Sequence, residues 1–581
     1  MAVNNKQKTK IEQTTEEIQG VRLSGAHIVC ECLVQEGVEV VFGYPGGAVL
    51  PLYDVLPSYK IRHILVRHEQ AAAHAADGFA RATGKVGVCL ATSGPGATNL
   101  ITGIANAFLD SSPVLALTGQ VPTSYVGKDS FQEIDITGIT LPITKHNYLV
   151  EDVEDLARLM KNAFHLANTG RPGPVLVDLP RDVLSAETVF DYPKTVHLRG
   201  YKPTLFGNIR QVKLAAQLIN EARQPVIIAG RGVLISQACQ ELRELAEKAD
   251  IPVVTTLLGV SCFPESHRLS FGMVGMHGMA YANAAIDNSD LVVAIGMRYD
   301  DRATGKTSAF APNARIVHID IDPAEIGKNI RVDVPIVGDV KNVLAQLNRE
   351  VARAEHSEWI QRIADWRVQF PTTEIRDTPE LLPQFVIRQL YEVTEGQAII
   401  VTDVGQHQMW AAQHYWYDRP NTLISAGGLG AMGFGLPAAM GAKVGCPGET
   451  VWAIVGDGGF QMNAQELATL AQENIPVKVA ILNNGCLGMV RQLQEFLCDR
   501  RYHHVRMRNP DFVKLTEAYG VRAFRVADKA EVRPTIEKAM AIDEPVVVEF
   551  VVTPDENVYP MVPPGSCLSE AIKDPRQVWV G

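Results

Sequence analysis

The chain has 581 residues, too many for a single hydrophobic core, so its length predicts three or four domains of ordinary size. Hydrophobic residues make up 46% of the sequence and charged residues 20%, which is typical of a globular protein rather than a disordered one. The formal net charge of -11 argues against a nucleic-acid-binding or membrane-surface protein, because the mean field would repel both partners.

Residues 1–20 lack the apolar stretch of a secretory signal and contain several acids, so we expect a flexible tail there. No stretch of the sequence approaches the roughly 18 apolar residues that a membrane helix needs. The nine cysteines are odd in number and include no metal-like CxxC pair, which indicates reduced thiols and a cytoplasmic protein.

Short β-branched runs alternate with helical patterns along the chain, and each run ends in a turn or a polar residue. The runs lie at 86–93, 113–119, 173–180, 224–230, 290–296, 314–322, 450–458 and 477–484. This alternation predicts an α/β protein with parallel sheets, in which ligands bind at the carboxyl ends of strands. Two stretches break the pattern, near 190–208 and 366–383, and we predict that these linkers separate three α/β segments.

A glycine-rich turn, residues 456–459, follows the buried run 450–455, and Asn483-Asn484 follows a strand predicted at 477–482. With the helix predicted at 463–473, the distance is one βαβ step, so Asp457 and Asn484 are expected on neighbouring strand ends. Their oxygens and a loop carbonyl near Cys486 suit Mg²⁺, and glycines let a backbone approach a phosphate. Each motif alone is an ordinary turn; in this order and spacing they predict a metal-diphosphate site.

The two motifs together resemble the diphosphate-binding motif of the thiamine diphosphate (ThDP) enzymes. That resemblance implies a glutamate against the aminopyrimidine ring of the cofactor, and Glu69, after the predicted strand 61–68, fits the family pattern. An isolated glutamate there would instead be a helix-start residue stabilised by the helix dipole. Met432 matches the hydrophobic residue that keeps the cofactor bent, although a methionine of the core is the alternative interpretation.

Within those enzymes, the chain resembles the acetohydroxyacid synthases over nearly its whole length. The shared motifs lie at 44–48, 93–99, 119–122, 131–133, 144–146, 170–174 and 403–408. The central segment is similar to the FAD-holding part of the anabolic synthases at 272–278 and 298–302, and the FAD-free catabolic enzymes lack the second motif. Supporting segments lie at 230–232, 318–322 and 338–340, where acids at strand ends suit ribose or adenine contacts.

The resemblance implies roles for individual residues of this sequence. Catalytic or carbonyl-orienting roles fall on Glu69, Gln132, Gly46, Gly47 and Lys145. Implied ThDP contacts are Glu69, Val404, Gly405, Gln406, His407, Gly430, Met432, Asp457, Gly458, Gly459, Asn484 and Met489, and the Mg²⁺ ligands are Asp457, Asn484 and Cys486 through its backbone. Implied FAD contacts are Arg171, Gly230, Arg231, Gly232, Met276, His277, Gly296, Arg298, Asp300, Arg302, Asp320, Ile321, Asp339 and Val340. The implied substrate pocket comprises Leu493, Phe131, Ser124 and Met276.

The implied fold is three doubly wound parallel-sheet domains: a pyrimidine-binding domain at 21–190, a central FAD-associated domain at 205–355 and a diphosphate-binding domain at 380–555. A C-terminal tail, 556–581, would lie over the active site. The implied reaction decarboxylates pyruvate and adds the two-carbon unit to a second 2-oxoacid, pyruvate or 2-oxobutyrate, with FAD structural because no electrons are transferred overall. The resemblance further implies a homodimer or dimer of dimers with active sites shared between two chains, and a small regulatory subunit.

Leu493 departs from the family, most of which carries a tryptophan that shapes the second-substrate pocket and the herbicide channel. The loss of the indole predicts a weaker preference for 2-oxobutyrate and poor binding of sulfonylurea-type inhibitors. Ser124, where many relatives have arginine, points the same way, and Arg181 and Tyr299 are milder changes.

Three other functions remain open from the sequence. A pyruvate oxidase would share ThDP and FAD but use the flavin for redox chemistry. Glyoxylate carboligase lacks the glutamate, so Glu69 argues against it. A non-catalytic binding subunit on the same fold is disfavoured by the presence of Glu69, Asp457 and Asn484.

Overall fold

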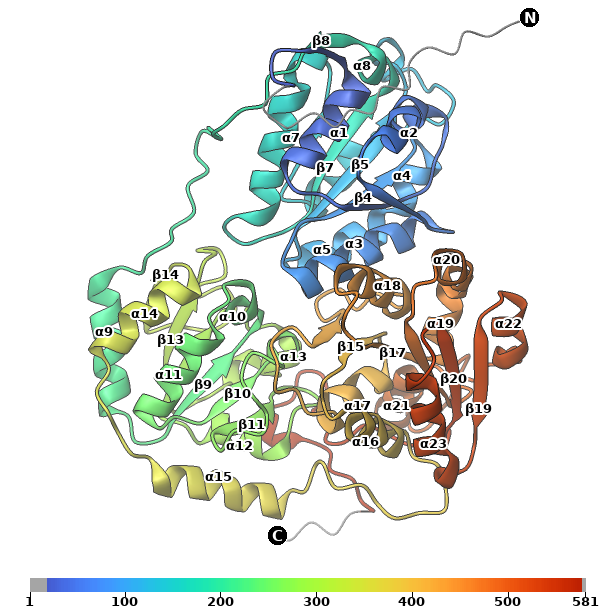
Figure 1. The fold of residues 1–581 in the computed structure, drawn as a ribbon. Coiled ribbons are helices and arrows are strands. Elements are labelled where there is room, and N and C mark those ends of the chain that lie inside the picture. Colours follow the sequence, from blue (N-terminus) through green and yellow to red (C-terminus); the bar gives the residue numbers. More distant parts are fainter. Residues whose placement is uncertain (1–17, 577–581) are drawn as a thin grey trace, which may run out of the picture. The chain divides into compact units, whose positions relative to one another are not determined.

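The computed structural model describes residues 18–576, which fall into two compact units. The first unit comprises the described residues up to 201 except 81–84, and the second comprises 81–84 and the rest of the described chain. The described residues form three six-stranded sheets, one in the first unit and two in the second, and neighbouring strands within each run parallel (Figure 1). The predicted α/β class with three parallel sheets is confirmed.

The sheet of the first unit has its strands in the order β3 (Arg62–Leu65), β2 (Val40–Gly43), β4 (Gly87–Ala91), β5 (Val114–Gln120), β7 (Val175–Pro180) and β6 (His146–Leu149). Its helices are α1 (Gly25–Gln35), α2 (Leu50–Val55), α3 (Glu69–Thr83), α4 (Pro95–Asn99), α5 (Ile101–Leu109), α6 (Ile136–Thr140), α7 (Val153–Asn168) and α8 (Arg181–Ser185). A separate antiparallel pair, β1 (Arg22–Ser24) and β8 (Glu187–Val189), joins the two ends of this unit.

The central sheet has the order β11 (Ser270–Met273), β10 (Val253–Thr255), β9 (Pro225–Ala229), β12 (Leu291–Ile295), β13 (Arg315–Asp320) and β14 (Val334–Val337). Its helices are α9 (Ile209–Glu221), α10 (Arg231–Ile235), α11 (Cys239–Ala249), α12 (Ala280–Asp287), α13 (Asp301–Thr304), α14 (Val340–Glu350) and α15 (Ser357–Gln369). Alternate residues of β12 enter two separate cores, because side chains of a strand alternate between faces. Helices α9, α11 and α14 cover one face, and α12 and α15 cover the other.

The third sheet has the order β16 (Leu423–Ser425), β15 (Ile399–Thr402), β17 (Val451–Gly456), β18 (Lys478–Asn483), β20 (Val546–Val551) and β19 (Arg522–Val526). Its helices are α16 (Pro383–Thr394), α17 (Gln406–His414), α18 (Gly435–Gly445), α19 (Asp457–Met462), α20 (Leu467–Glu473), α21 (Gly488–Leu497), α22 (Phe512–Ala518) and α23 (Lys529–Met540).

In each sheet the chain first adds strands on one side of an inner strand and then crosses to the other side. In the third sheet, β15 is followed by β16 on one side and by β17 on the other, and β9 and β2 occupy the same position in the other two sheets. The loops that leave the two strands at such a point run in opposite directions and leave a crevice at the carboxyl edge. The crevices therefore lie at β15 and β17, at β9 and β12, and at β2 and β4.

Two local predictions need correction. The helix predicted at 463–473 is instead a 3₁₀ turn at Ala464–Glu466 followed by α20, and a separate short helix, α19, precedes it because the turn 456–459 itself begins helical structure. The linker predicted at 366–383 begins inside α15, where Trp366 packs edge-on against the buried Trp359. Tryptophans spaced seven residues apart lie on one helical face, so this segment folds as helix.

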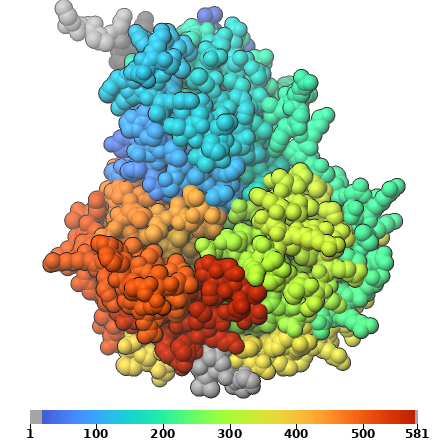
Figure 2. Space-filling model, turned by 180° about the vertical axis from the view of Figure 1, so that it is seen from behind, coloured from blue at the N-terminus to red at the C-terminus, as the bar shows by residue number. Residues whose placement is uncertain are grey.

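The C-terminal residues 556–576 pack within the second unit. In Figure 2 the last described residues, in red, lie against both the green central segment and the orange third segment. The backbone of Val562 donates to the carbonyl of Met276 in the central segment, and that of Val558 donates to Oε1 of Gln492 in the third. No helix in the described range 18–576 combines the length and apolar character needed to cross a membrane.

Candidate active site

The crevice of the third sheet holds the predicted metal-binding carboxylate. Asp457 is the first residue of α19, directly after β17, and is 1% exposed. Nδ2 of Asn509 donates to Oδ2 of Asp457 over 2.6 Å and to Oδ1 of Asn483 over 2.9 Å. Burial raises the pKa of Asp457 to about 6. A neighbouring cation would stabilise the charged carboxylate at this position.

Asn484 follows β18, the neighbour of β17, so the structure brings Asp457 and Asn484 to adjacent strand ends as the spacing predicts. Oδ1 of Asn484 accepts from the backbone of Cys486 over 3.0 Å, and its Nδ2 donates to Gln406 over 3.4 Å. Within residues 18–576 no three His, Cys, Asp or Glu side chains gather into a metal-binding group. The predicted set of one carboxylate, one amide oxygen and one carbonyl does not need such a group.

Asp403, to which the family resemblance gives no individual role above, connects three segments of this crevice. Its buried carboxylate accepts hydrogen bonds from the backbones of Val404, Gly433 and Gly435 over 2.8 to 3.1 Å. A Cβ at Gly459 would lie 2.4 Å from Oδ1 of Asp403, so only glycine fits there. The available signal was an aspartate directly after the strand 399–402, inside the motif 403–408.

His407 contributes an unpaired polar atom to the same crevice. The ring is buried, its Nε2 has no hydrogen-bond partner among the described residues, and a Cβ at Gly456 would lie 2.9 Å from Nδ1. Burial lowers the pKa of His407 to about 3, so the ring is neutral at pH 7. A buried ring nitrogen without a partner beside Asp457 suits a bound polar group, since leaving it unpaired costs free energy.

Other residues that the resemblance implies as ThDP contacts also lie close to one another in this crevice. A Cβ at Gly458 would lie 2.8 Å from Leu487 and 3.6 Å from the methyl of Met432, and one at Gly430 would lie 3.7 Å from Val404. Gly458 therefore leaves a cradle that any larger residue would fill. On α21, Met489 and the half-buried Leu493 are spaced four residues apart and so lie on one helical face.

The crevice of the first unit holds the predicted glutamate. Glu69 is the first residue of α3, after β3, and its Oε2 accepts from Nδ2 of Asn99 over 2.8 Å. A Cβ at Gly96 would lie 3.2 Å from Oε1 of Glu69. The loop 93–99 therefore lies directly against the carboxyl group, and the amide of Asn99 is bonded to only one of its two oxygens.

The other predicted residues of the first unit surround the same loop. A Cβ at Gly46 would lie 2.4 Å from the side chain of Thr92, so the loop after β2 passes tightly over the end of β4, whereas Gly47 faces open space. Gln132 has a positive φ of 58°, and its backbone contacts Gly94. Its neighbour Phe131 is 89% exposed, and Ser124, in a 3₁₀ turn at Thr123–Tyr125, is exposed.

Lys145 is not placed with these residues. It precedes β6 at the amino edge of the sheet, whereas Glu69 follows β3 at the carboxyl edge, and β6 and β3 are opposite edge strands. The ammonium group donates to the carbonyls of Leu166 and Thr169 and to the hydroxyl of Tyr201. Arg171 also lies before the amino end of its strand, β7, and its Nε donates to Ser111. In this chain Lys145 therefore links the start of β6 to the end of α7 and to Tyr201 by hydrogen bonds.

The central crevice, between β9 and β12, is lined mainly by backbone. A Cβ at Gly230 would lie 2.3 Å from the carbonyl of Gly296, and the backbone of Gly232 donates to that carbonyl over 3.0 Å. Arg231 begins α10 between them, and Arg298 follows Gly296 and Met297 as a half-buried residue. The glycines let the two turns pack against each other.

The carboxylates predicted around the central crevice already serve as helix caps. Asp300 accepts from the backbones of Arg302 and Ala303 at the start of α13, and Asp339 accepts from Asn342 at the start of α14 and from the hydroxyl of Ser236. Val340 is buried in the first turn of α14. Asp320 is the last residue of β13 and Ile321 follows it, and Oδ1 of Asp320 accepts from the backbone of Asp322.

Met276 and His277 follow β11 and meet both Arg302 and the C-terminal segment. The backbone of Met276 donates to the carbonyl of Arg302 over 2.7 Å, and Nη1 of Arg302 lies 3.5 Å from Sδ of Met276. His277 is buried with Nδ1 3.3 Å from the carbonyl of Pro560, and burial lowers its pKa to about 4.

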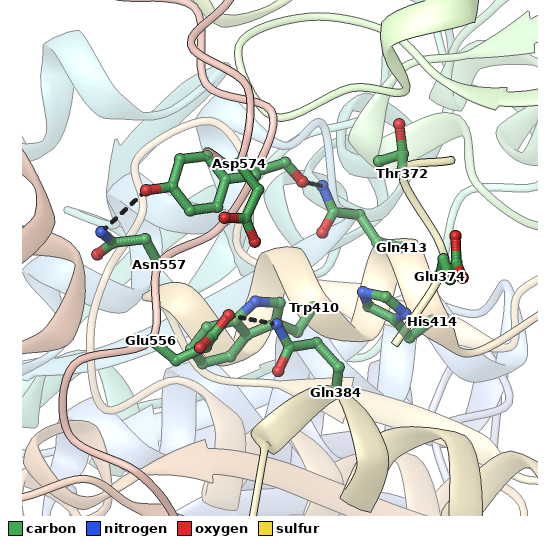
Figure 3. Close-up of a pocket in the computed structure, with 10 residues that line it drawn as sticks. Thr372, Glu374, Gln384, Trp410, Gln413, His414, Glu556, Asn557 and Asp574 are labelled. Carbon is green, nitrogen blue, oxygen red and sulfur yellow. Dashed lines mark hydrogen bonds between the residues drawn. The ribbon is translucent and has the colours of Figure 1, made fainter. Parts of the chain in front are cut away.

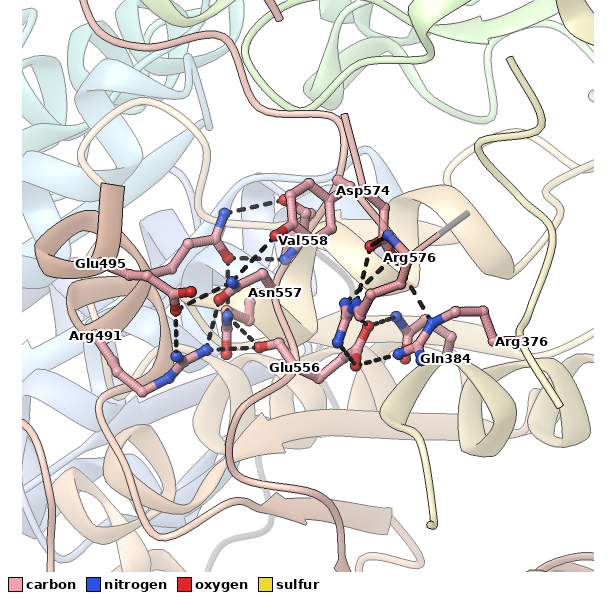
Figure 4. Close-up of polar contacts among 12 residues, drawn as sticks. Arg376, Gln384, Arg491, Glu495, Glu556, Asn557, Val558, Asp574 and Arg576 are labelled. Atoms are coloured by element: carbon pink, nitrogen blue, oxygen red, sulfur yellow. Dashed lines mark hydrogen bonds and ion pairs between the residues drawn. The ribbon is translucent and has the colours of Figure 1, made fainter. Parts of the chain in front are cut away.

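The C-terminal segment contacts α17 and α21, two helices of the third segment (Figure 4). Nε2 of Gln406, at the start of α17, donates to Gln492 on α21 and to the carbonyl of Glu556, both over 2.9 Å. The buried guanidinium of Arg491 donates to the same carbonyl and to Asn557. Residues 577–581 of the predicted tail lie outside the described residues.

Three family models match the chain in order. They are the thiamine pyrophosphate enzyme N-terminal TPP-binding domain at residues 23–139, the central domain at 212–347 and the C-terminal TPP-binding domain at 403–550.

Several curated relatives match almost the whole chain. It is 52% identical to "Acetolactate synthase large subunit IlvB1" of Mycobacterium tuberculosis, with 94% of this chain and 91% of the relative covered. It is 51% identical to "Acetolactate synthase large subunit" of Corynebacterium glutamicum, with 94% and 90% covered. It is 50% identical to "Probable acetolactate synthase large subunit" of Methanocaldococcus jannaschii, with 95% and 96% covered.

Proposed function

Because the chain belongs to the thiamine pyrophosphate enzymes, and among them to the acetolactate synthase large subunits, we propose a reaction and assign its residues. The enzyme condenses two pyruvates to 2-acetolactate with loss of CO₂, a step of branched-chain amino-acid biosynthesis, and also joins pyruvate to 2-oxobutyrate to give 2-aceto-2-hydroxybutyrate. The observation that supports this most directly is the third-sheet crevice, which holds Asp457, Asn484, the cradle at Gly458 and His407, whose Nε2 has no partner among the described residues.

The residues of that crevice fit a diphosphate held through Mg²⁺. Asp457, Asn484 and the carbonyl of Cys486 would supply the protein oxygens. Burial disfavours the charged form of Asp457 and so raises its pKa, and a bound cation would stabilise that charged form. In the tautomer that carries its proton on Nε2, His407 would donate to the diphosphate, and Met432 would support the cofactor from the side of the Gly458 cradle. When bound, ThDP supplies the nucleophilic carbon and the electron sink for decarboxylation.

Glu69 would hold and move the proton that activates the cofactor. Asn99 donates to Oε2, so Oε1 would be the oxygen that meets the aminopyrimidine ring. The close approach of Gly96 to Oε1 excludes larger side chains from that side. Gln132 and the backbone of Gly46 and Gly47 would orient the substrate carbonyls.

For FAD, the central crevice offers a glycine-lined edge at Gly230 and Gly296 followed by Arg298, and Arg302 lies beside Met276 after β11. These groups fit a dinucleotide, and we propose FAD with a structural role. Asp300 and Asp339 already accept hydrogen bonds from the first turns of their helices, so only the acceptor positions left over after capping would be available to FAD. We further propose a cytoplasmic homodimer or dimer of dimers with a small regulatory subunit, since the relatives are named large subunits.

A colorimetric acetolactate assay on pyruvate, with ThDP, Mg²⁺ and FAD omitted in turn, tests the reaction. Activity should require ThDP and Mg²⁺, and the flavin should keep its absorbance through turnover. Bleaching of the flavin in proportion to product would instead indicate an oxidase. Glu69→Gln should reduce kcat by about 100-fold or more, as expected for loss of a general acid-base group, and unchanged activity would contradict the assignment.

Mixing two inactive variants tests whether each active site is shared. If Glu69 and Asp457 of one site come from different subunits, a heterodimer of Glu69→Gln and Asp457→Ala retains one intact site of two. Random pairing of equal amounts should then restore about a quarter of wild-type activity in a symmetric dimer. No recovery, with heterodimers demonstrated by tagged pull-down, would contradict a shared site.

A further inference from the structure

A small polar cavity lies at the carboxyl-terminal end of α17. Its walls come from α16, from α17, from the segment around Thr372 and from the C-terminal segment, as Figure 3 shows. The space open to the centre of a water molecule is about 20 Å³. One water needs about 10 to 15 Å³ by the same measure, so the cavity has room for one or two waters.

Four buried polar atoms on these walls have no hydrogen-bond partner among the described residues. They are Nε1 of Trp410, Nδ1 of His414, Oε1 of Gln413 and Oε1 of Gln384. The orientation of Gln413 is determined by its environment, because its Nε2 donates to the carbonyls of His277 and Tyr559. Nε2 of Gln384 donates to Glu556 in the same way. The two amide oxygens are therefore acceptors that need a donor.

The four unpaired atoms include both hydrogen-bond donors and acceptors, and this combination indicates which kind of ligand the cavity would bind. Trp410 can only donate, and the two glutamine oxygens can only accept. A metal cation would be repelled by the N–H of Trp410, and an anion would face the carboxylates of Glu556 and Asp574. Those two carboxylates are already bound by Arg376 and Arg576, so they do not call for an added cation (Figure 4). Water both donates and accepts, and it fits the available volume.

We propose that this cavity is a binding site for ordered water, which joins α16 and α17 to the C-terminal segment. Glu556, Asn557, Tyr559 and Asp574 close the cavity from the C-terminal side. Helix α17 carries Gln406 and His407 at its other end, so the hydrated cavity fastens the C-terminal segment to the same helix that enters the cofactor crevice. The cavity is built from this chain alone and is independent of the reaction proposed above.

A crystal structure of the full-length protein, at a resolution that shows ordered water, is the direct test. One or two peaks within hydrogen-bond distance of Nε1 of Trp410 and of Oε1 of Gln413 are expected. An empty cavity, or side chains rearranged so that these atoms bond each other, would overturn the proposal. So would an ion at coordination distances of about 2.0 to 2.6 Å.

A matched pair of variants gives an independent measure of the Trp410 N–H. Trp410 and Trp359 are both 3% exposed, and Nε1 of Trp359 donates to the carbonyl of Pro225 over 3.0 Å. Trp410→Phe and Trp359→Phe remove the same ring atoms and one N–H each. If water accepts from Trp410, the two variants should lower Tm by similar amounts.

If the N–H of Trp410 lacks a partner, its removal relieves an unsatisfied donor. Trp410→Phe would then lower Tm clearly less than Trp359→Phe or raise it, and that result would count against the water site. The crystal structure decides the question should either variant fail to fold.

Discussion

The central and third sheets reverse their strand order in the same way, but the two crevices treat their polar groups differently. At β9 and β12, glycines pack backbone against backbone, and Asp300 and Asp339 are satisfied as helix caps. At β15 and β17, Asp457 is buried with a raised pKa, and Nε2 of His407 has no partner among the described residues. Topology locates both crevices, whereas unmet polar groups indicate where a ligand contributes most to the free energy of the folded state.

The largest expected effect comes from Asp457→Ala, which should abolish most of the activity while leaving the stability of the cofactor-free protein intact. Activity should fall by more than about 100-fold, because metal clamps contribute several kcal/mol to such reactions. The cofactor-free protein should keep its Tm or gain a few degrees, since the variant removes a buried carboxylate and Asn509 still bonds Asn483. Differential scanning calorimetry without cofactors, beside the acetolactate assay, measures both. A marked loss of Tm would mean that Asp457 is a structural residue.

Asp403→Asn should weaken ThDP binding next. Its amide nitrogen would face backbone donors of Val404, Gly433 or Gly435, at a cost of about 1 to 3 kcal/mol, or roughly 5- to 150-fold in affinity. The concentration of ThDP that gives half-maximal activity reports the effect. Asp178→Asn is the control, since Asp178 is a buried carboxylate of the first unit that accepts from Thr118 and Gln120. Equal effects of the two variants would show that only general stability changed.

The pH dependence of Mg²⁺ binding follows from the pKa of Asp457. Burial raises that pKa to about 6, so protons compete with the metal below pH 6, and not above it. The Mg²⁺ requirement should rise about tenfold per pH unit below 6 and level off above it. Titrating Mg²⁺ at several pH values with ThDP saturating measures this, and a requirement independent of pH down to 5 would exclude Asp457 as a ligand.

Leu493→Trp should shift the choice of second substrate by about fivefold toward 2-oxobutyrate, an effect near 1 kcal/mol of added aromatic contact. Competition between pyruvate and 2-oxobutyrate, with both products quantified, gives the ratio. Leu497→Trp is the matched control, because Leu497 lies on the same helix and is 51% exposed. A similar shift in both variants would contradict a specific role for Leu493.

The smallest changes in stability and cofactor binding are expected from variants of the central crevice. Asp339→Ala should cost about 1 kcal/mol of unfolding free energy through loss of the α14 cap, and Asp339→Asn should restore most of it because asparagine is also a good cap. Chemical denaturation measures both, and flavin absorbance after gel filtration measures FAD retention. If Asp339→Asn regains stability but still loses FAD, then Asp339 also binds the cofactor. The central crevice would then resemble the third-sheet crevice in having a carboxylate that needs a ligand.

Local pattern was sufficient for the strands and for the pairing of Asp457 with Asn484, because one βαβ step places consecutive strand ends side by side. Glu69 was also found from pattern, at the junction of β3 and α3. The placement of Lys145 was not predictable from its motif, since a residue before a strand and a residue after one lie at opposite edges of the same sheet. The helix predicted at 463–473 begins as a 3₁₀ turn, and the glycine turn before it already begins a separate helix.

The sequence by itself determined the α/β class, the order of the three sheets and the chemistry offered at the ends of β17 and β18, because these depend on short-range periodicity and on residue type. Only the tertiary structure decided the role of Asp403, because two of its donors, Gly433 and Gly435, lie about 30 residues further along the chain. It also decided the partners of Glu556, which come from Arg376 and Arg576 on either side in the sequence. Such contacts close long loops and leave no local periodicity, so they appear only when the whole chain is folded.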